Sequence, residues 1–142
     1  MCKHLFLNYI KSIELPKAFL HLIDEGFVLL VFKDNVILEI DDAKEIDQLI
    51  VDKLVGDHPF VALVDARDIS SSITPEAREF FTNDPLVLQI RKAQALVVNN
   101  LSTKLLANFY MKFHKHNSPV KVFSDYTKAE IWVKERRSEW YK

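Results

Sequence analysis

The sequence predicts a single α/β domain in which helices cover a mostly parallel sheet. Residues 19–24, which alternate polar and apolar, and the apolar run 27–33 flank Glu25-Gly26, as the strands of an antiparallel hairpin do. Short β-branched runs then alternate with amphipathic stretches, and the length of 142 residues matches one domain. Because strand–helix–strand units need right-handed crossovers, we expect the later strands to run parallel.

The N-terminal half supplies the hairpin and the first helix. Residues 27–33 are apolar almost throughout, which predicts a central strand. Asp34-Asn35 then turns the chain into the short run 36–38. Asp41 and Asp42 follow at a predicted helix start, where the helix dipole favours carboxylates. The apolar residues that recur behind them at helical spacing are Ala43, Ile46, Ile50 and Leu54.

The C-terminal half is a regular alternation of strands and helices. Residues 60–66, 93–100 and 120–123 are predicted strands. Each is followed by a residue that favours a helix N-terminus, and Thr74 has a proline behind it at the first helical position. These predicted N-caps are Thr74, Ser102 and Asp125. We expect an N-terminal extension at 1–17, a domain at 18–137 and a C-terminal tail at 138–142, whose Trp140 and Tyr141 pack on their own domain or on a second subunit.

Composition excludes several classes of function. With 19 basic and 20 acidic residues the chain lacks the basic surface of a nucleic-acid-binding protein. It contains no run of 18 apolar residues and no secretory signal, so we expect a cytoplasmic protein without membrane insertion. The single Cys2 cannot form an internal disulfide. Phosphate-binding loops use several clustered glycines, whereas this chain has only Gly26 and Gly56. We therefore expect no cofactor, no metal and no catalytic residue.

Polar residues follow the carboxyl ends of the predicted parallel strands, which form the sheet edge where ligands bind in open α/β sheets. Asp65-Ala66-Arg67-Asp68 also fits a strand-end turn closed by an Arg–carboxylate pair. The serines also fit a solvated connection, and the cap residues need no function beyond capping. The candidates for interaction or phosphorylation at this edge are Asp65, Arg67, Asp68, Ser70, Ser71, Ser72, Thr74, Asn99, Asn100 and Ser102.

The segments FVALVDARDISSSITPEAREFF, AQALVVNNLSTKLLANFYMKFHK and PVKVFSDYTKAEIWVKE together resemble the SpoIIAA-like branch of the STAS (anti-sigma-factor antagonist) fold, found in small bacterial proteins. In the signalling members, a strand ending in Asp precedes an Asp-Ser-Ser-Gly motif at a helix start, and a partner kinase phosphorylates the serine. The resemblance places Asp65 at the strand end and Thr74 at the phosphoacceptor position. Ile73 replaces the acid of that motif, and Pro75-Glu76 replaces its Ser-Gly.

Three functions are compatible with these observations. The first is a non-enzymatic regulatory or protein-interaction module, bound to a partner protein or to a second copy as a homodimer, and regulated by phosphorylation at Thr74 or Ser70 to Ser72. The alternative is a carrier of a small apolar ligand or lipid, of the Sec14 kind, suggested by the aromatic residues of 109–113 beside the apolar run 85–90. A third is a hydrolase in which Asp65 and Asp68 hold a metal ion.

Overall fold

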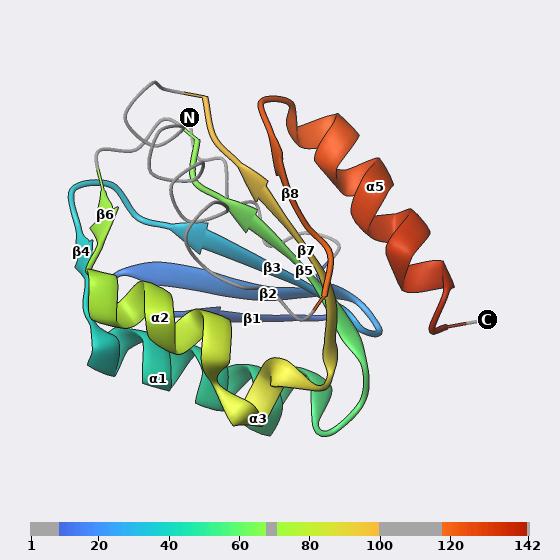
Figure 1. Ribbon diagram of the computed structural model, residues 1–142, viewed down its shortest axis with the longest axis horizontal. Helices are drawn as coiled ribbons and strands as arrows, with labels where there is room; N and C mark the ends of the chain where they lie inside the picture. The colour runs from blue at the N-terminus through green and yellow to red at the C-terminus, as the bar shows by residue number, and fades with distance from the viewer. Residues whose placement is uncertain (1–8, 68–70, 100–117, 142) are drawn as a thin grey trace.

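A computed structural model gives the fold and describes residues 9–67, 71–99 and 118–141 (Figure 1). At its centre lies a six-stranded sheet with the strand order β1-β2-β3-β5-β7-β8. These strands are β1 (Lys11–Glu14), β2 (Ala18–Asp24), β3 (Phe27–Phe32), β5 (Phe60–Asp65), β7 (Arg91–Val97) and β8 (Val120–Phe123). The predicted α/β class is confirmed.

The sheet is antiparallel at one side and parallel at the other. Strands β1, β2 and β3 form an antiparallel meander, whereas β3, β5, β7 and β8 run parallel, as the alternation of strands and helices predicts. Strand β1 lies within 1–17, the segment expected to be an extension, so the sheet begins before residue 18. Strand β7 begins two residues earlier than the predicted 93–100 and ends at Val97, which leaves Asn99 beyond the strand.

Helices cover both faces of the sheet (Figure 1). The helical segments between residues 40 and 88 lie on one face, and the helix of residues 126–138 lies on the other. A separate two-stranded parallel sheet joins β4 to β6. The remaining elements are β4 (Ile37–Leu38), α1 (Ile40–Leu49), the π-helix η1 (Ile50–Val55), β6 (Ser72–Ile73), α2 (Pro75–Asn83), α3 (Pro85–Leu88) and α5 (Tyr126–Ser138). The helix expected after Ser102 lies outside the described residues.

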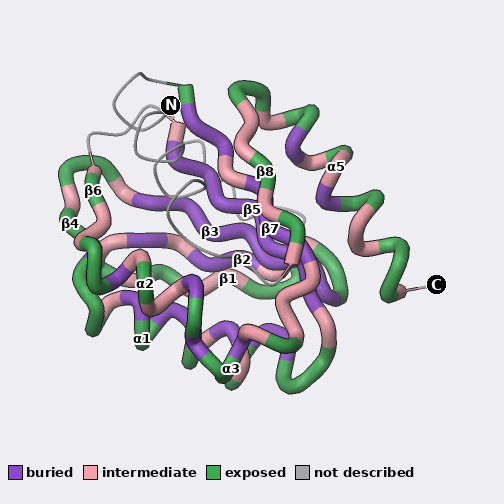
Figure 2. Tube along the Cα trace, in the orientation of Figure 1, coloured by how far each residue is buried: buried purple, intermediate pink, exposed green. Residues whose placement is uncertain are grey.

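The core follows from the two-residue period of the strands. Leu30 of β3 and Val64 of β5 face α1 and η1, while Leu29 and Leu63 face Ala129 on α5. Figure 2 shows both strands buried along their length, as expected for parallel strands covered on two sides.

Two predicted helix starts are confirmed. Thr74 caps α2 with Pro75 at its first position, and Asp125 caps α5 by accepting from the N–H groups of Thr127 and Lys128. Helix α1 begins after Glu39, whose side chain forms a reciprocal capping box with Asp42.

The C-terminal residues pack partly on their own domain. The Tyr141 hydroxyl donates to the Pro59 carbonyl, and its ring lies against Gly26, a turn residue with a φ of 71°. Trp140 remains 50% exposed, with Lys92 Nζ 4.5 Å from the centre of its ring.

Candidate functional site

The ends of three parallel strands lie in one row. Asp65, Val97 and Phe123 are register neighbours on β5, β7 and β8. The ladder continues one step further, because Ala66 N–H donates to the Val97 carbonyl and Val98 N–H to the Phe123 carbonyl. The segments that carry Asp65, the exposed Asn99 and the exposed Asp125 therefore leave the sheet at the same edge.

Asp65 is held by Arg67 at this edge. The Asp65 carboxyl group is buried and accepts from Arg67 Nε at 3.0 Å, Arg67 Nη2 at 2.9 Å and the Arg67 backbone N–H at 3.1 Å. The guanidinium also lies over the Tyr126 ring, 4.6 Å from its centre, and burial raises the pKa of the Tyr126 hydroxyl. These contacts fit the strand-end turn interpretation, and they use the acceptor sites that a metal ion would need.

The serine-rich segment is bound to the β3–β4 turn. Ser71 Oγ donates to the Lys33 carbonyl at 2.6 Å and accepts from Val36 N–H at 3.1 Å. Ser71 is therefore a structural bridge, and it does not behave as a residue of a solvated connection. Ser72 is exposed, and it pairs with Ile37 in the two-stranded sheet. Four candidates lie outside the described residues: Asp68, Ser70, Asn100 and Ser102.

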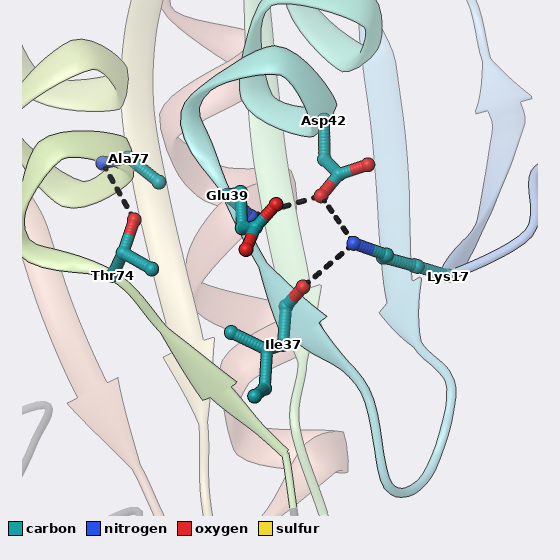
Figure 3. Close-up of polar contacts among 6 residues, drawn as sticks. All are labelled: Lys17, Ile37, Glu39, Asp42, Thr74 and Ala77. Carbon is teal, nitrogen blue, oxygen red and sulfur yellow. Dashed lines mark hydrogen bonds and ion pairs between the residues drawn. The ribbon is translucent and has the colours of Figure 1, made fainter.

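The N-termini of α1 and α2 lie side by side next to this small sheet (Figure 3). Thr74 Oγ1 accepts from Ala77 N–H at 3.2 Å, which is the capping bond of α2. At the start of α1, Lys17 Nζ donates to Asp42 Oδ2 at 2.7 Å and to the Ile37 carbonyl at 2.8 Å. Burial pushes the pKa of Asp42 up, but the Lys17 ammonium and the Glu39 N–H outweigh it and lower that pKa.

Apolar side chains are exposed at the same place. Ile37 is 56% exposed and Ile40 is 37% exposed, and the neighbouring Ser72 is exposed as well. Acidic residues lie at the starts of both neighbouring helices, namely Glu39, Asp41 and Glu76. We call the group formed by Ile37, Ile40, Ser72, Thr74 and these three acids the β4–β6 corner.

An apolar cavity of about 120 Å³ lies between the sheet and the helices on the α1 side. Alternate residues of three parallel strands form one wall, with Leu30, Val64 and Leu96 at its middle, and Ile46 and Phe81 lie among the residues opposite. The polar side chains in its lining are Asp47, Ser71, Ser72, Arg78, Arg91 and Gln94.

The cavity was not predicted from the sequence. The available signal is the pair of small residues Ala62 and Ala66, which occupy alternate positions of β5 and its extension on the cavity side. Small side chains at such positions leave space that larger neighbours cannot fill. The corner was likewise missed, because the pairing of β4 with β6 joins distant segments.

Comparison with known proteins identifies the family. Residues 21–137 match a domain of unknown function, DUF7793. The chain belongs to this family. Among solved structures, the DUF7793 chain is similar to an uncharacterized DUF3478-family protein with a SpoIIAA-like fold from Shewanella loihica PV-4. The two share 17% sequence identity, the TM-score is 0.55, and the similarity covers 87% of this chain and 90% of that one. The predicted SpoIIAA-like fold is thus confirmed, and no curated protein matches the chain.

Two negative observations apply to the part of the DUF7793 chain that the structure describes. None of its helices has the length and apolar character needed to cross a membrane. Within residues 9–67, 71–99 and 118–141, His, Cys, Asp and Glu side chains form no cluster of three or more suited to a metal ion.

Proposed function

We propose that this DUF7793 protein is a non-enzymatic interaction module of the STAS type that binds a protein partner through the β4–β6 corner. The observation that supports this is the exposure of Ile37 and Ile40 beside Thr74, the residue that the STAS resemblance places at the phosphoacceptor position. Exposed aliphatic side chains next to a polar rim are typical of a recognition surface.

The chemistry of the corner defines the partner. Ile37 and Ser72 are register partners in a parallel pair, so their side chains lie on the same face of the small sheet. Covering Ile37 and Ile40, which are already partly buried, contributes about 1 kcal/mol each. Glu39, Asp41 and Glu76 add negative charge around them, so the complementary partner surface is apolar at its centre and basic at its rim.

Phosphorylation would regulate this surface at Thr74 or Ser72. A phosphate on Thr74 would lie at the N-terminus of α2, where backbone N–H groups favour an anion, although Glu76 would repel it. Ser72 is the more accessible hydroxyl, because Thr74 Oγ1 is part of the α2 cap and Ser71 Oγ makes two hydrogen bonds. Either phosphate would place additional charge beside Ile37 and change partner affinity.

Affinity capture from the source cell tests the proposal with a matched pair of variants. Ile37→Asp places a charge in the corner, whereas Ile131→Asp places one at a similarly exposed position on α5, which covers the other face of the sheet. We expect the partner captured by the wild type to be retained by Ile131→Asp and lost by Ile37→Asp. Thr74→Ala and mass spectrometry of the phosphorylated peptides test the regulatory part. Equal capture by both aspartate variants would refute the proposal.

A second candidate function, a carrier of a small apolar ligand, is favoured by the cavity. Its volume of about 120 Å³ is close to that of engineered apolar cavities of about 150 Å³, which bind benzene. Native mass spectrometry of the freshly purified protein tests this candidate. We expect a mass adduct that is lost when Ala62→Leu fills the cavity, and a clean apo mass for the wild type would contradict it.

A further inference from the structure

We infer that the cavity takes a small carboxylic acid whose apolar body of about six carbons lies along the sheet and whose carboxylate meets Arg91. The inference rests on the second candidate function, the carrier, and names the class of ligand. It does not require binding at the β4–β6 corner, although Ser72 belongs to the corner and also to the cavity lining.

The apolar lining of the cavity indicates that most of the ligand is hydrocarbon. Strands β3, β5 and β7 each contribute alternate side chains to the same wall, and at its middle these are Leu30, Val64 and Leu96. Ile46 and Phe81 lie among the residues on the helix side. An apolar wall of this kind binds hydrocarbon by removing it from water, and it has no hydrogen bonds to offer to a polar body.

The cavity lining includes a cation, the guanidinium of Arg91, whose orientation is fixed by a hydrogen bond. Arg91 begins β7, and its Nη2 donates to the Phe81 carbonyl at 2.8 Å, which orients the guanidinium. Arg91 lines the cavity together with Asp47 of α1 and Gln94 of β7. A guanidinium with a fixed plane matches the two oxygens of a carboxylate.

Asp47 does not neutralise the positive charge of Arg91, because the Asp47 carboxyl group keeps its proton in the folded protein. Asp47 is 2% exposed and Asp84 is 6% exposed, and the Oδ2 atom of each is buried without a donor from the groups that the structure describes. Asp84 Oδ1 already accepts from Leu86 N–H. Burial first, and then a hydrogen bond with Asp84, raises the pKa of Asp47 to about 8, although Arg91 opposes this. The proton retained by Asp47 supplies the donor for the hydrogen bond between the two buried carboxyl groups.

The charges that face the cavity therefore favour an anion. Among the described lining residues, Arg91 of β7 and Arg78 of α2 are positive and Asp47 is neutral. Asp84 is not among the lining residues, and it offsets one positive charge at most. A neutral ligand of the same shape would exclude water from Arg91 without replacing its hydrogen bonds, and such losses weaken binding.

Calorimetric titration of the full chain with benzoate and with benzyl alcohol tests the inference, since the two differ in the acid group. We expect benzoate to bind at least about tenfold more tightly. Arg91→Gln should reduce benzoate affinity about tenfold without weakening the binding of benzyl alcohol, whereas Arg136→Gln on α5 should change neither affinity. Circular dichroism establishes that each variant is folded.

Two results would overturn the inference, and they differ in what they leave standing. Equal affinity of the wild type for acid and alcohol would remove the carboxylate preference but retain the carrier. Binding of neither probe, together with a clean apo mass, would remove the carrier as well. The capture experiment with Ile37→Asp is unaffected by either result.

Discussion

Replacing Asp47 by asparagine should change how the stability of the protein depends on pH. In the folded state burial raises the pKa of Asp47 from 3.8 to about 8, so the folded protein keeps a proton that the unfolded chain releases. The folded state binds more protons throughout this window, and its stability must therefore fall as pH rises. The asparagine side chain would not titrate, and its amide would donate to Asp84 Oδ2 in place of the retained proton.

The magnitude follows from the slope. Each pH unit inside the window changes the free energy of unfolding by about 1.4 kcal/mol, so the wild type should lose about 3 kcal/mol between about pH 5 and pH 7 from this group alone. Asp47→Asn should therefore gain about 3 kcal/mol relative to the wild type over the same interval.

Urea denaturation followed by circular dichroism at pH 5, 6 and 7 measures the difference directly. The control is Asp52→Asn, which makes the same substitution at an exposed position on η1. A constant difference between Asp47→Asn and the wild type across the three pH values would refute the reasoning. It would show that Asp47 is ionised in the folded protein.

Three further predictions concern stability and are checked by urea titration. Arg67→Leu removes the guanidinium that pairs with the buried Asp65 carboxylate and should cost about 3 kcal/mol or more. A loss below about 1 kcal/mol would mean that the pair is solvated. Ser71→Ala removes both hydrogen bonds to the β3–β4 turn and should cost about 1 to 3 kcal/mol, while Ser72→Ala, at an exposed position, should cost little. Gly26→Ala should cost more than Gly56→Ala, because both glycines have positive φ but only at Gly26 would the new Cβ meet the Tyr141 ring; equal losses would contradict that contact.

The parts of the fold that the sequence predicts are those with local signals. Strands β3 and β5 are continuous apolar runs because both of their faces are buried. The starts of α2 and α5 follow from Thr74-Pro75 and Asp125, whose capping chemistry involves only neighbouring residues. Strand β1 gave no such signal, since Lys11–Glu14 is a short edge strand with exposed ends and little apolar alternation.

The candidate site divides in the same way. The Asp65–Arg67 pair is two residues apart and could be inferred from sequence. The bridging role of Ser71 could not, because its partners Lys33 and Val36 belong to a distant turn. Asp47 is a polar residue of an amphipathic helix, and only the packing of α1 against the junction of α2 and α3 brings it to Asp84.

The dissociation constant of the captured partner for wild type, Ile37→Asp and Ile131→Asp tests the central claim, recognition through the β4–β6 corner, most directly. We predict that Ile37→Asp weakens binding at least about tenfold, equivalent to about 1.4 kcal/mol, and that Ile131→Asp binds as the wild type does. Unchanged affinity of Ile37→Asp, or equal weakening by both substitutions, would contradict the account.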